Sequence, residues 1–506
     1  MTAAATPVSA TPALPYAFAR RFGVVLQPDG ECGLSVALRE GADPRILLEV
    51  RRHLARSFAV TAADPATFDR LLSESYMTDG EAAALAMGAQ GIDALAVGLP
   101  SAEDLLDTAD DAPAIRLING IIADAVRRGV SDIHIEPYES GLVIRMRIDG
   151  LLRETLRMPA HVAPVIVSRI KVMARLDIAE RRVPQDGRIG LTLGGKSLDV
   201  RVSTLPARGG ERVVLRILDK DNAGIDLEAL GLTAETEALL RDAFAEPNGI
   251  ILVTGPTGSG KTTTLYAGLR LLNDGSRNIL TVEDPVEYAV DGIGQTQVNP
   301  KVGLSFAAGL RAILRQDPDV VMVGEIRDRE TADIAVQASL TGHLVLSTVH
   351  TNDAVGAITR MRDMKIEPFL LASTLRAVIA QRLVRRLCGR CSRPAPVSRT
   401  ALVEQLGLLG LPASLADGVT ALPAAVGCEA CRNIGYRGRV GVFEILRVDE
   451  GLHDLIVHRE SARVIRKAAE EAGMVPLERA GWNQVRAGLT TLDEIVRVLS
   501  MAEGKG

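Results

Sequence analysis

The chain has 506 residues and a formal net charge of −5, with 47% hydrophobic and 24% charged residues. This length exceeds what one core usually organises, and the hydrophobic content predicts that most of the chain folds, as several domains. The slight acidic excess and an aromatic content of 3% argue against a surface built to coat nucleic acid. No apolar run approaches the roughly 20 residues that cross a membrane, so we expect a cytosolic protein.

The N-terminal part is predicted to hold one small domain between two segments without regular structure. Residues 1–15 are rich in Ala, Thr and Pro and lack a basic stretch and a long apolar stretch, which predicts a disordered tail and not a signal peptide. Residues 16–90 mix short apolar segments with helical stretches, and residues 91–112 are read as an acidic, Pro-bounded linker. The lone Cys32 is expected to be a small buried hydrophobe.

Residues 113–225 have the pattern of an α+β domain. Isoleucines at helical spacing are followed by segments that alternate as strands, with Asp149-Gly150 as a hairpin turn. In the last two of these strands the apolar side chains share one face. This alternation directs arginines, among them Arg201 and Arg216, away from the core.

From residue 226 the pattern changes to short, continuous apolar runs separated by helical segments. Such runs predict strands that are buried on both faces, as in a parallel sheet flanked by helices, and therefore an α/β domain. The predicted strands cover 250–253, 279–282, 320–323 and 344–346. The predicted parts of this half are an α/β domain at 226–380, a cysteine subdomain at 381–437 and a helical C-terminal part at 438–506.

The most specific motif is a Gly-rich segment that matches the phosphate-loop pattern Gly-x4-Gly-Lys-Ser/Thr at every fixed position. An apolar strand precedes it and a helical run follows, so the N–H groups of the loop and the helix N-terminus would face an anion. Lys261 would reach the β- and γ-phosphates of ATP, and Thr262 would hold Mg²⁺. The predicted nucleotide contacts are Gly255, Pro256, Thr257, Gly258, Ser259, Gly260, Lys261, Thr262 and Thr263.

Polar residues lie at the ends of three predicted strands, and ligands of such sheets bind at the carboxyl ends of the strands. Glu325 is expected on the magnesium side. Glu283 and Glu287 are both candidates for orienting the attacking water, and the sequence does not choose between them. His343 and His350 could sense the γ-phosphate or stabilise charge. The alternative is that these residues take no part in a nucleotide site. The acids would then be exposed loop residues, and the histidines would be satisfied by backbone groups.

With the phosphate loop, these motifs resemble those of the secretion ATPase superfamily. The segments 283–287, 317–328 and 341–352 look like its Asp, Walker B and His boxes, and segments within 131–188 look like its middle domain. Residues 354–371 look most like general secretory pathway protein E, the assembly ATPase of type II secretion systems. The alternative within the superfamily is the type IV pilus extension ATPase.

This resemblance implies a RecA-like core, a PAS-like middle domain and a six-membered ring that hydrolyses ATP without a phosphoenzyme. The nucleotide would lie between the middle and RecA-like domains, where Arg201 and Arg216 match family arginines that approach it; the alternative is a solvated strand face. Residues 16–90 would dock onto the cytosolic domain of an inner-membrane partner, beside a polytopic platform protein. The chain would then be peripheral on the cytosolic face of the inner membrane.

Four cysteines form two Cys-x-x-Cys pairs, Cys388 with Cys391 and Cys428 with Cys431. Each pair can place two thiolates on one metal, and four thiolates suit tetrahedral Zn²⁺. The alternatives are reduced structural thiols or a redox pair. The family that the chain resembles carries a tetracysteine metal subdomain at this place, which favours zinc.

The residues around the first cysteine pair are basic. This segment could meet anionic phospholipid or an acidic partner, or it could be a solvated helix face. Its arginines are Arg382, Arg385, Arg386, Arg390 and Arg393.

Two other classes of function fit part of the pattern. One is a nucleic-acid motor, since RecA-like rings also drive helicases, but the acidic balance and the lack of an aromatic stacking surface argue against it. The other is a zinc-containing adaptor whose nucleotide is only structural. Glu325, Glu287 and the arginines together favour turnover instead.

Overall fold

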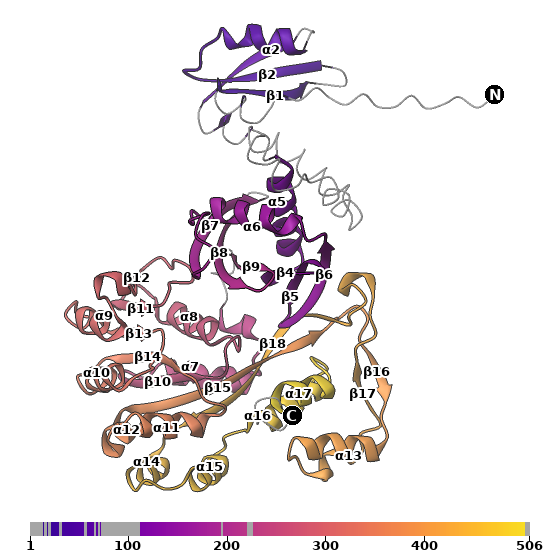
Figure 1. Ribbon diagram of the computed structural model, residues 1–506. Helices are drawn as coiled ribbons and strands as arrows, with labels where there is room; N and C mark the ends of the chain where they lie inside the picture. The colour runs from indigo at the N-terminus through magenta and orange to yellow at the C-terminus, as the bar shows by residue number, and fades with distance from the viewer. Residues whose placement is uncertain are drawn as a thin grey trace. The chain divides into compact units, whose positions relative to one another are not determined.

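A computed structural model describes residues 14, 18, 22–29, 33–54, 58–64, 67–68, 71, 112–193, 196–219 and 226–500. The chain divides into two compact units (Figure 1). One unit comprises residues 1–148 and 152–218, and the other comprises 149–151 and 219–506. The predicted tail, apart from Leu14, the predicted linker up to residue 111 and Cys32 lie outside the described residues.

The N-terminal part contains a small sheet with the strand order β1-β2-β3. β1 and β2 pair antiparallel, β2 and β3 pair parallel, and a helix connects the latter two. Val24 and Val36 of the sheet pack against Val50 of the helix. The elements are β1 (Val24–Asp29), β2 (Gly33–Arg39), α2 (Ile46–Leu54) and β3 (Ala59–Ala63).

The α+β pattern predicted for the middle part is confirmed. Its six strands form one sheet in the order β6-β5-β4-β9-β8-β7. The predicted turn between β5 and β6 is present, with left-handed φ values of 47° at Asp149 and 84° at Gly150. The elements are α5 (Ala112–Arg127), β4 (Val130–Tyr138), β5 (Gly141–Ile148), β6 (Leu151–Met158), α6 (Val162–Met173), β7 (Gln185–Leu193), β8 (Lys196–Ala207) and β9 (Gly210–Asp219).

The core of this domain forms between one face of the sheet and two helices. Val200, Leu215 and Ile122 of β8, β9 and α5 are fully buried in it. A buried ion pair lies beside this core, because Lys171 of α6 donates to Glu211 at 2.7 Å and to the carbonyl of Glu180 at 2.6 Å. Lys171 thereby ties the segment after α6 to the sheet.

The second unit is built on a seven-stranded sheet in the order β12-β11-β13-β14-β10-β15-β18. Neighbouring strands pair parallel except β15 and β18, which pair antiparallel. This confirms the predicted α/β fold. The strands are β10 (Gly249–Thr254), β11 (Ile279–Glu283), β12 (Ile293–Gln297), β13 (Val320–Val323), β14 (Leu344–Val349), β15 (Leu375–Leu387) and β18 (Tyr436–Arg447).

Helices cover both faces of this sheet (Figure 1). On one face Phe244 and Leu269 pack with β10 and β14 residues, and on the other Leu310, Val336 and Ile358 do so. The flanking elements are η2 (Leu227–Leu230), α7 (Ala234–Phe244), α8 (Lys261–Leu272), η3 (Pro300–Val302), α9 (Phe306–Ile313), α10 (Arg329–Leu340), α11 (Ala354–Asp363) and α12 (Pro368–Thr374).

The C-terminal part differs from the prediction in its first ten residues. Residues 438–447 belong to β18, because Val440, Val442 and Phe443 are buried in pairing with β15; helices follow only after this strand. The remaining elements are β16 (Arg393–Pro396), α13 (Arg399–Leu408), η4 (Ala413–Ala416), β17 (Ala421–Ala424), η5 (Glu429–Cys431), α14 (Glu450–Val457), α15 (Ala462–Glu471), α16 (Leu477–Arg486) and α17 (Leu492–Ser500).

The buried ion pair of the middle domain leads to a stability prediction. Lys171→Met leaves the Glu211 carboxylate buried without its partner, so it should lower the free energy of unfolding by about 3–5 kcal/mol. The matched control is Arg182→Met, because Arg182 pairs with Glu180 while its own side chain is 87% exposed, and such pairs contribute less than about 1 kcal/mol. Urea unfolding of the whole chain measures both; equal losses would contradict the prediction.

Candidate nucleotide site and cysteine cluster

The phosphate loop connects the central strand β10 to helix α8. β10 is buried over its whole length, and α8 begins at Lys261, directly after the loop. Gly255, Gly258 and Gly260 have φ values of 147°, 82° and 89°, which residues with side chains rarely adopt. The loop therefore curls around the N-terminus of α8, where unpaired N–H groups favour an anion.

Strand β15 runs so close to this loop that two of the glycines have no room for a side chain. A Cβ on Gly255 would lie 2.5 Å from the carbonyl oxygen of Gln381. A Cβ on Gly260 would lie 2.9 Å from the side-chain Nε2 of the same Gln381. The side chain of Gln381 also accepts a hydrogen bond of 2.7 Å from Thr264 of α8. Gln381 thus contacts both ends of the loop, a role that its sequence position does not signal.

Lys261 and Glu325 lie at the same edge of the sheet. Nζ of Lys261 donates to the carbonyls of Gly255 at 2.8 Å and Pro256 at 3.1 Å. Burial lowers the pKa of Lys261, and the nearby negative charge of Glu325 opposes that shift. The negative charge of Glu325 therefore acts on the lysine predicted to contact phosphate.

Glu325 is held by two further side chains. Arg327 forms an ion pair with it, and Nε2 of His350 lies 3.4 Å from its Oε2. Burial and the charge of Lys261 lower the pKa of His350, and the contact with Glu325 opposes that shift. His350 follows β14 directly, at the carboxyl end of the sheet, as the sequence predicted.

His343 lies at the other end of β14. Leu344 pairs with Gly249, the first residue of β10, whereas Val349 pairs with Thr254, the last one. Nδ1 of His343 lies 2.8 Å from the carbonyl oxygen of Ala338. Within one chain His343 therefore lies at the edge of the sheet opposite to the phosphate loop. Its contact with a backbone carbonyl is the one expected if the histidine is satisfied by backbone groups and does not contact nucleotide.

The two acids left open by the sequence have different surroundings. Glu283 ends β11 and is 3% exposed. Its carboxylate accepts hydrogen bonds from Tyr266, Thr281 and Gln295, and burial raises the pKa of Glu283. Glu287 lies in the segment after β11 and is partly exposed.

The predicted arginines of the middle domain lie on the strands expected for them. Arg201 is on β8 beside Arg188 of β7. Arg216 on β9 is 56% exposed and donates to Asp132 at 2.8 Å. Burial raises the pKa of Asp132, but hydrogen bonds from Arg216 and Ser131 and the charges of Arg216 and Arg147 together bring the net pKa below its usual value.

The basic segment is not a helix face, so that alternative is wrong. Arg382, Arg385 and Arg386 belong to strand β15. Arg382 is 2% exposed and donates to the carbonyl of Asn352 at 2.6 Å. It faces a pocket of about 410 Å³ beside the phosphate loop, lined also by Pro256, Thr257, Gly258, Ser259, Asn352, Leu383 and Val498.

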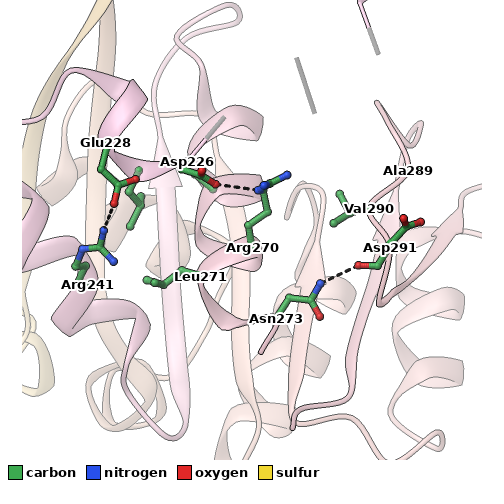
Figure 2. Close-up of a pocket in the computed structure, with 11 residues that line it drawn as sticks. Asp226, Glu228, Arg241, Arg270, Leu271, Asn273, Ala289, Val290 and Asp291 are labelled. Atoms are coloured by element: carbon green, nitrogen blue, oxygen red, sulfur yellow. Dashed lines mark hydrogen bonds and ion pairs between the residues drawn. The ribbon is translucent and has the colours of Figure 1, made fainter. Parts of the chain in front are cut away.

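A second pocket of about 560 Å³ lies along α8, away from the phosphate loop (Figure 2). Arg241 pairs with Glu228 there, and Arg270 pairs with Asp226 at 3.0 Å. Nδ2 of Asn273 donates to the carbonyl of Asp291 at 2.8 Å. Both guanidinium groups of the lining thus pair with carboxylates, and Asp291 adds a third carboxylate.

The four predicted cysteine ligands converge. Their Sγ atoms all lie within 4.8 Å of one another, and the sulfurs of Cys391 and Cys431 are 3.7 Å apart. Burial raises the pKa of Cys431, but the N–H groups of Cys428 and Gly435 together with the neighbouring thiols bring the net pKa to about 6. Burial raises the pKa of Cys391 to about 11. A convergent set with one thiol poised as thiolate fits a tetrahedral thiolate metal such as Zn²⁺.

The strands that carry this cluster are clamped by helix α17. The carboxylate of Glu494 accepts from the side chain of Arg385 at 2.7 Å and from its backbone N–H at 3.0 Å. The Arg385 guanidinium also stacks 4.0 Å above the ring of Tyr436. These contacts join the end of β15 to the start of β18, on either side of the segment that carries the cysteines.

Comparison with known proteins identifies the family. The family "Type II/IV secretion system protein" matches residues 107–497, and a family described as a domain of "GSPII protein E" matches residues 13–76. Type II secretion system protein E of Aeromonas hydrophila is 53% identical over 494 residues, which cover 97% of each chain. The chain belongs to the type II secretion system protein E family. Type II secretion system ATPase E of Vibrio cholerae is 51% identical and covers 96% of each chain.

Solved structures agree with this membership. The pilus retraction motor PilT with bound ADP is 26% identical, with a TM-score of 0.50 over 74% of this chain and 95% of that one. The ATPase DotB of Yersinia pseudotuberculosis is 21% identical, with a TM-score of 0.56 over 76% of this chain and 93% of that one, and shows the fold alone. The predicted family, secretion ATPase, is confirmed. Among the described helices, none is long and apolar enough to cross a bilayer.

For this secretion ATPase the cysteine geometry predicts one zinc ion per chain. Cys431→Ser should abolish stoichiometric zinc in elemental analysis and lower the melting temperature, because it removes one of four thiolates from a site that closes a small subdomain. Cys32→Ser is the matched control and should keep the metal. Purified protein without metal, or a Cys431→Ser variant that retains it, would contradict the prediction.

Proposed function

We propose that this chain is the Mg²⁺-dependent ATPase of a type II secretion system, acting as a hexamer that powers pseudopilus assembly and protein export. The observation that carries the proposal is the placement of Glu325 beside Lys261 at the phosphate loop. The family membership and the motifs at the carboxyl edge of the sheet support it. A nucleic-acid motor has no comparable support.

In this proposal the loop N–H groups bind the β- and γ-phosphates, and Lys261 leaves its present carbonyl partners to contact the same oxygens. Glu283 or Glu287 orients the attacking water, and His350 and Arg327 hold Glu325 in place. The exposed hydroxyl of Thr262 and the oxygens of Glu325 are hard ligands that fit Mg²⁺. Bound there, Mg²⁺ would neutralise charge on the phosphates.

Arg201 and Arg216 are proposed to approach the γ-phosphate when the 113–225 domain closes on the 226–380 domain. An arginine that arrives only on closure couples charge stabilisation in the transition state to rigid-body motion. Asp132 would hold Arg216 in an extended orientation until then. The mechanical output would be this domain motion, passed around the ring.

The remaining parts are proposed to connect the motor to the membrane. Residues 16–90 would dock onto the cytosolic domain of an inner-membrane protein; residues 13–76 within and beside this range match a domain of GSPII protein E. A polytopic platform protein and anionic phospholipid would be further partners. The protein would thus work in the cytoplasm, peripheral to the inner membrane, with the zinc subdomain as a structural element.

Lys261→Ala tests the site. Because it removes a cation from the phosphates, it should lower the ATPase rate by about 100-fold or more. Purified variant and wild type are compared by phosphate release with Mg²⁺. Turnover at the wild-type rate would exclude the assignment of Lys261.

The same allele in the native host tests the biological role. Loss of exoproteins from the medium with normal surface pili supports the type II secretion role. Loss of pili with normal secretion would instead assign the chain to a pilus extension system.

Arg216→Ala should lower kcat about 10-fold or more and leave nucleotide binding within about threefold, because the arginine is needed in the transition state. Binding is measured with a fluorescent ATP analogue. Arg182→Ala, another exposed arginine of the same domain, is the control. If Arg216→Ala turns over like the control, Arg216 belongs to a solvated strand face.

A further inference from the structure

The buried acid Glu283 is the centre of a hydrogen-bonded cluster. Tyr266 of α8 donates to its Oε2, Thr281 of β11 donates to Oε1 at 2.6 Å, and Gln295 of β12 donates to Oε1 at 3.2 Å. The carboxylate thus accepts three hydrogen bonds, from donors on three elements. A carboxylate that accepts three hydrogen bonds from the protein at 3% exposure is poorly placed to hold a water for attack.

Side chains of the same cluster also form hydrogen bonds with the backbone of the segment that follows β11. The Tyr266 hydroxyl accepts the N–H of Glu287. Nε2 of Gln295 donates to the carbonyl of Tyr288 at 3.1 Å, and its Oε1 accepts the N–H of Val290 at 2.8 Å. The backbone around Glu287 is therefore fixed at three points by two side chains.

Ring packing and α8 add to this attachment. The rings of Tyr266 and Tyr288 meet edge to face, with centroids 4.4 Å apart. Tyr266 lies on the helix that begins at Lys261, about 7.5 Å further along its axis. At the far end of the segment Asn273, just after α8, holds the carbonyl of Asp291, as Figure 2 shows.

We infer that Tyr266 and Gln295 are positioning residues that hold Glu287 in register with Lys261, and that Glu283 is their buried anchor and not the acid that orients water. This inference rests on the proposed ATPase function. It assigns to α8 two tasks: its N-terminus binds phosphate, and its second turn fixes the acidic segment.

The two acids can be separated by isosteric variants. Glu287→Gln should lower kcat by about 100-fold or more, because the amide cannot act as a base toward water. Glu283→Gln should lose less than about 10-fold, because an amide can accept from Thr281 while the Tyr266 hydroxyl turns its hydrogen to suit. The reverse order of losses would overturn the inference.

Tyr266→Phe tests the positioning role directly. Removing the hydroxyl while keeping the ring should lower kcat about 10-fold with little change in the KM for ATP, because the phosphate loop is untouched. Tyr288→Phe keeps the ring contact and is the matched control, expected within about twofold of wild type. Gln295→Ala, on an outer strand, should repeat the Tyr266→Phe effect and serves if that variant fails to fold.

A double-mutant cycle shows whether Tyr266 acts through Glu287. If it does, Tyr266→Phe should change kcat less than twofold in a Glu287→Gln background. If the loss in kcat of the double variant equals the product of the two single losses, the inference is overturned. It is also overturned if Tyr266→Phe and Gln295→Ala turn over like wild type. A wild-type chain without Mg²⁺-dependent phosphate release would instead contradict the proposed ATPase function. Equal melting temperatures of the variants and the wild type exclude a general loss of structure.

Discussion

The close approach of strand β15 to the phosphate loop is the constraint on which the nucleotide site depends. The backbone of Gln381 fills the space that a side chain on Gly255 would need, and its amide group contacts the region of Gly260 and Thr264. The loop is thus shaped from two sides, by its own glycines and by a neighbouring strand more than a hundred residues later. The same strand carries the buried Arg382 and continues to Cys388, so the site and the cysteine cluster share one backbone element.

The sheet then decides which polar residues meet. Parallel strands end at one edge, so residues after β10, β11, β13 and β14 converge although they are far apart in sequence. Glu325 and His350 meet Lys261 for this reason. Glu283 ends its strand at the same edge, but its side chain turns into the interior between α8 and β12. The position of a residue along its strand therefore decides at which edge of the sheet it lies. The alternation of side chains decides whether it faces the edge or the buried interior.

These facts explain how far the sequence could be read. Continuous apolar runs and the glycine pattern predicted the central strands, the phosphate loop and α8, because they are dictated by local backbone needs and burial. β15 and β18 were missed because arginines and glycines interrupt their apolar residues. The burial of Arg382 was missed because its partner, the carbonyl of Asn352, is a backbone group without a sequence signature. Tyr266 and Gln295 carried no motif and became visible only through the contacts they make across three elements.

The cysteine subdomain is inserted between two strands that are neighbours in the sheet. Leu387 and Tyr436 are paired residues of the antiparallel strands β15 and β18, so the 48 residues between them leave and re-enter the sheet at neighbouring positions. Paired Cα atoms of such strands lie about 5 Å apart, a gap that a short hairpin turn can close. The subdomain is thus an insertion into a hairpin, and an ancestral chain could gain or lose it without rearranging the sheet that holds the nucleotide loop.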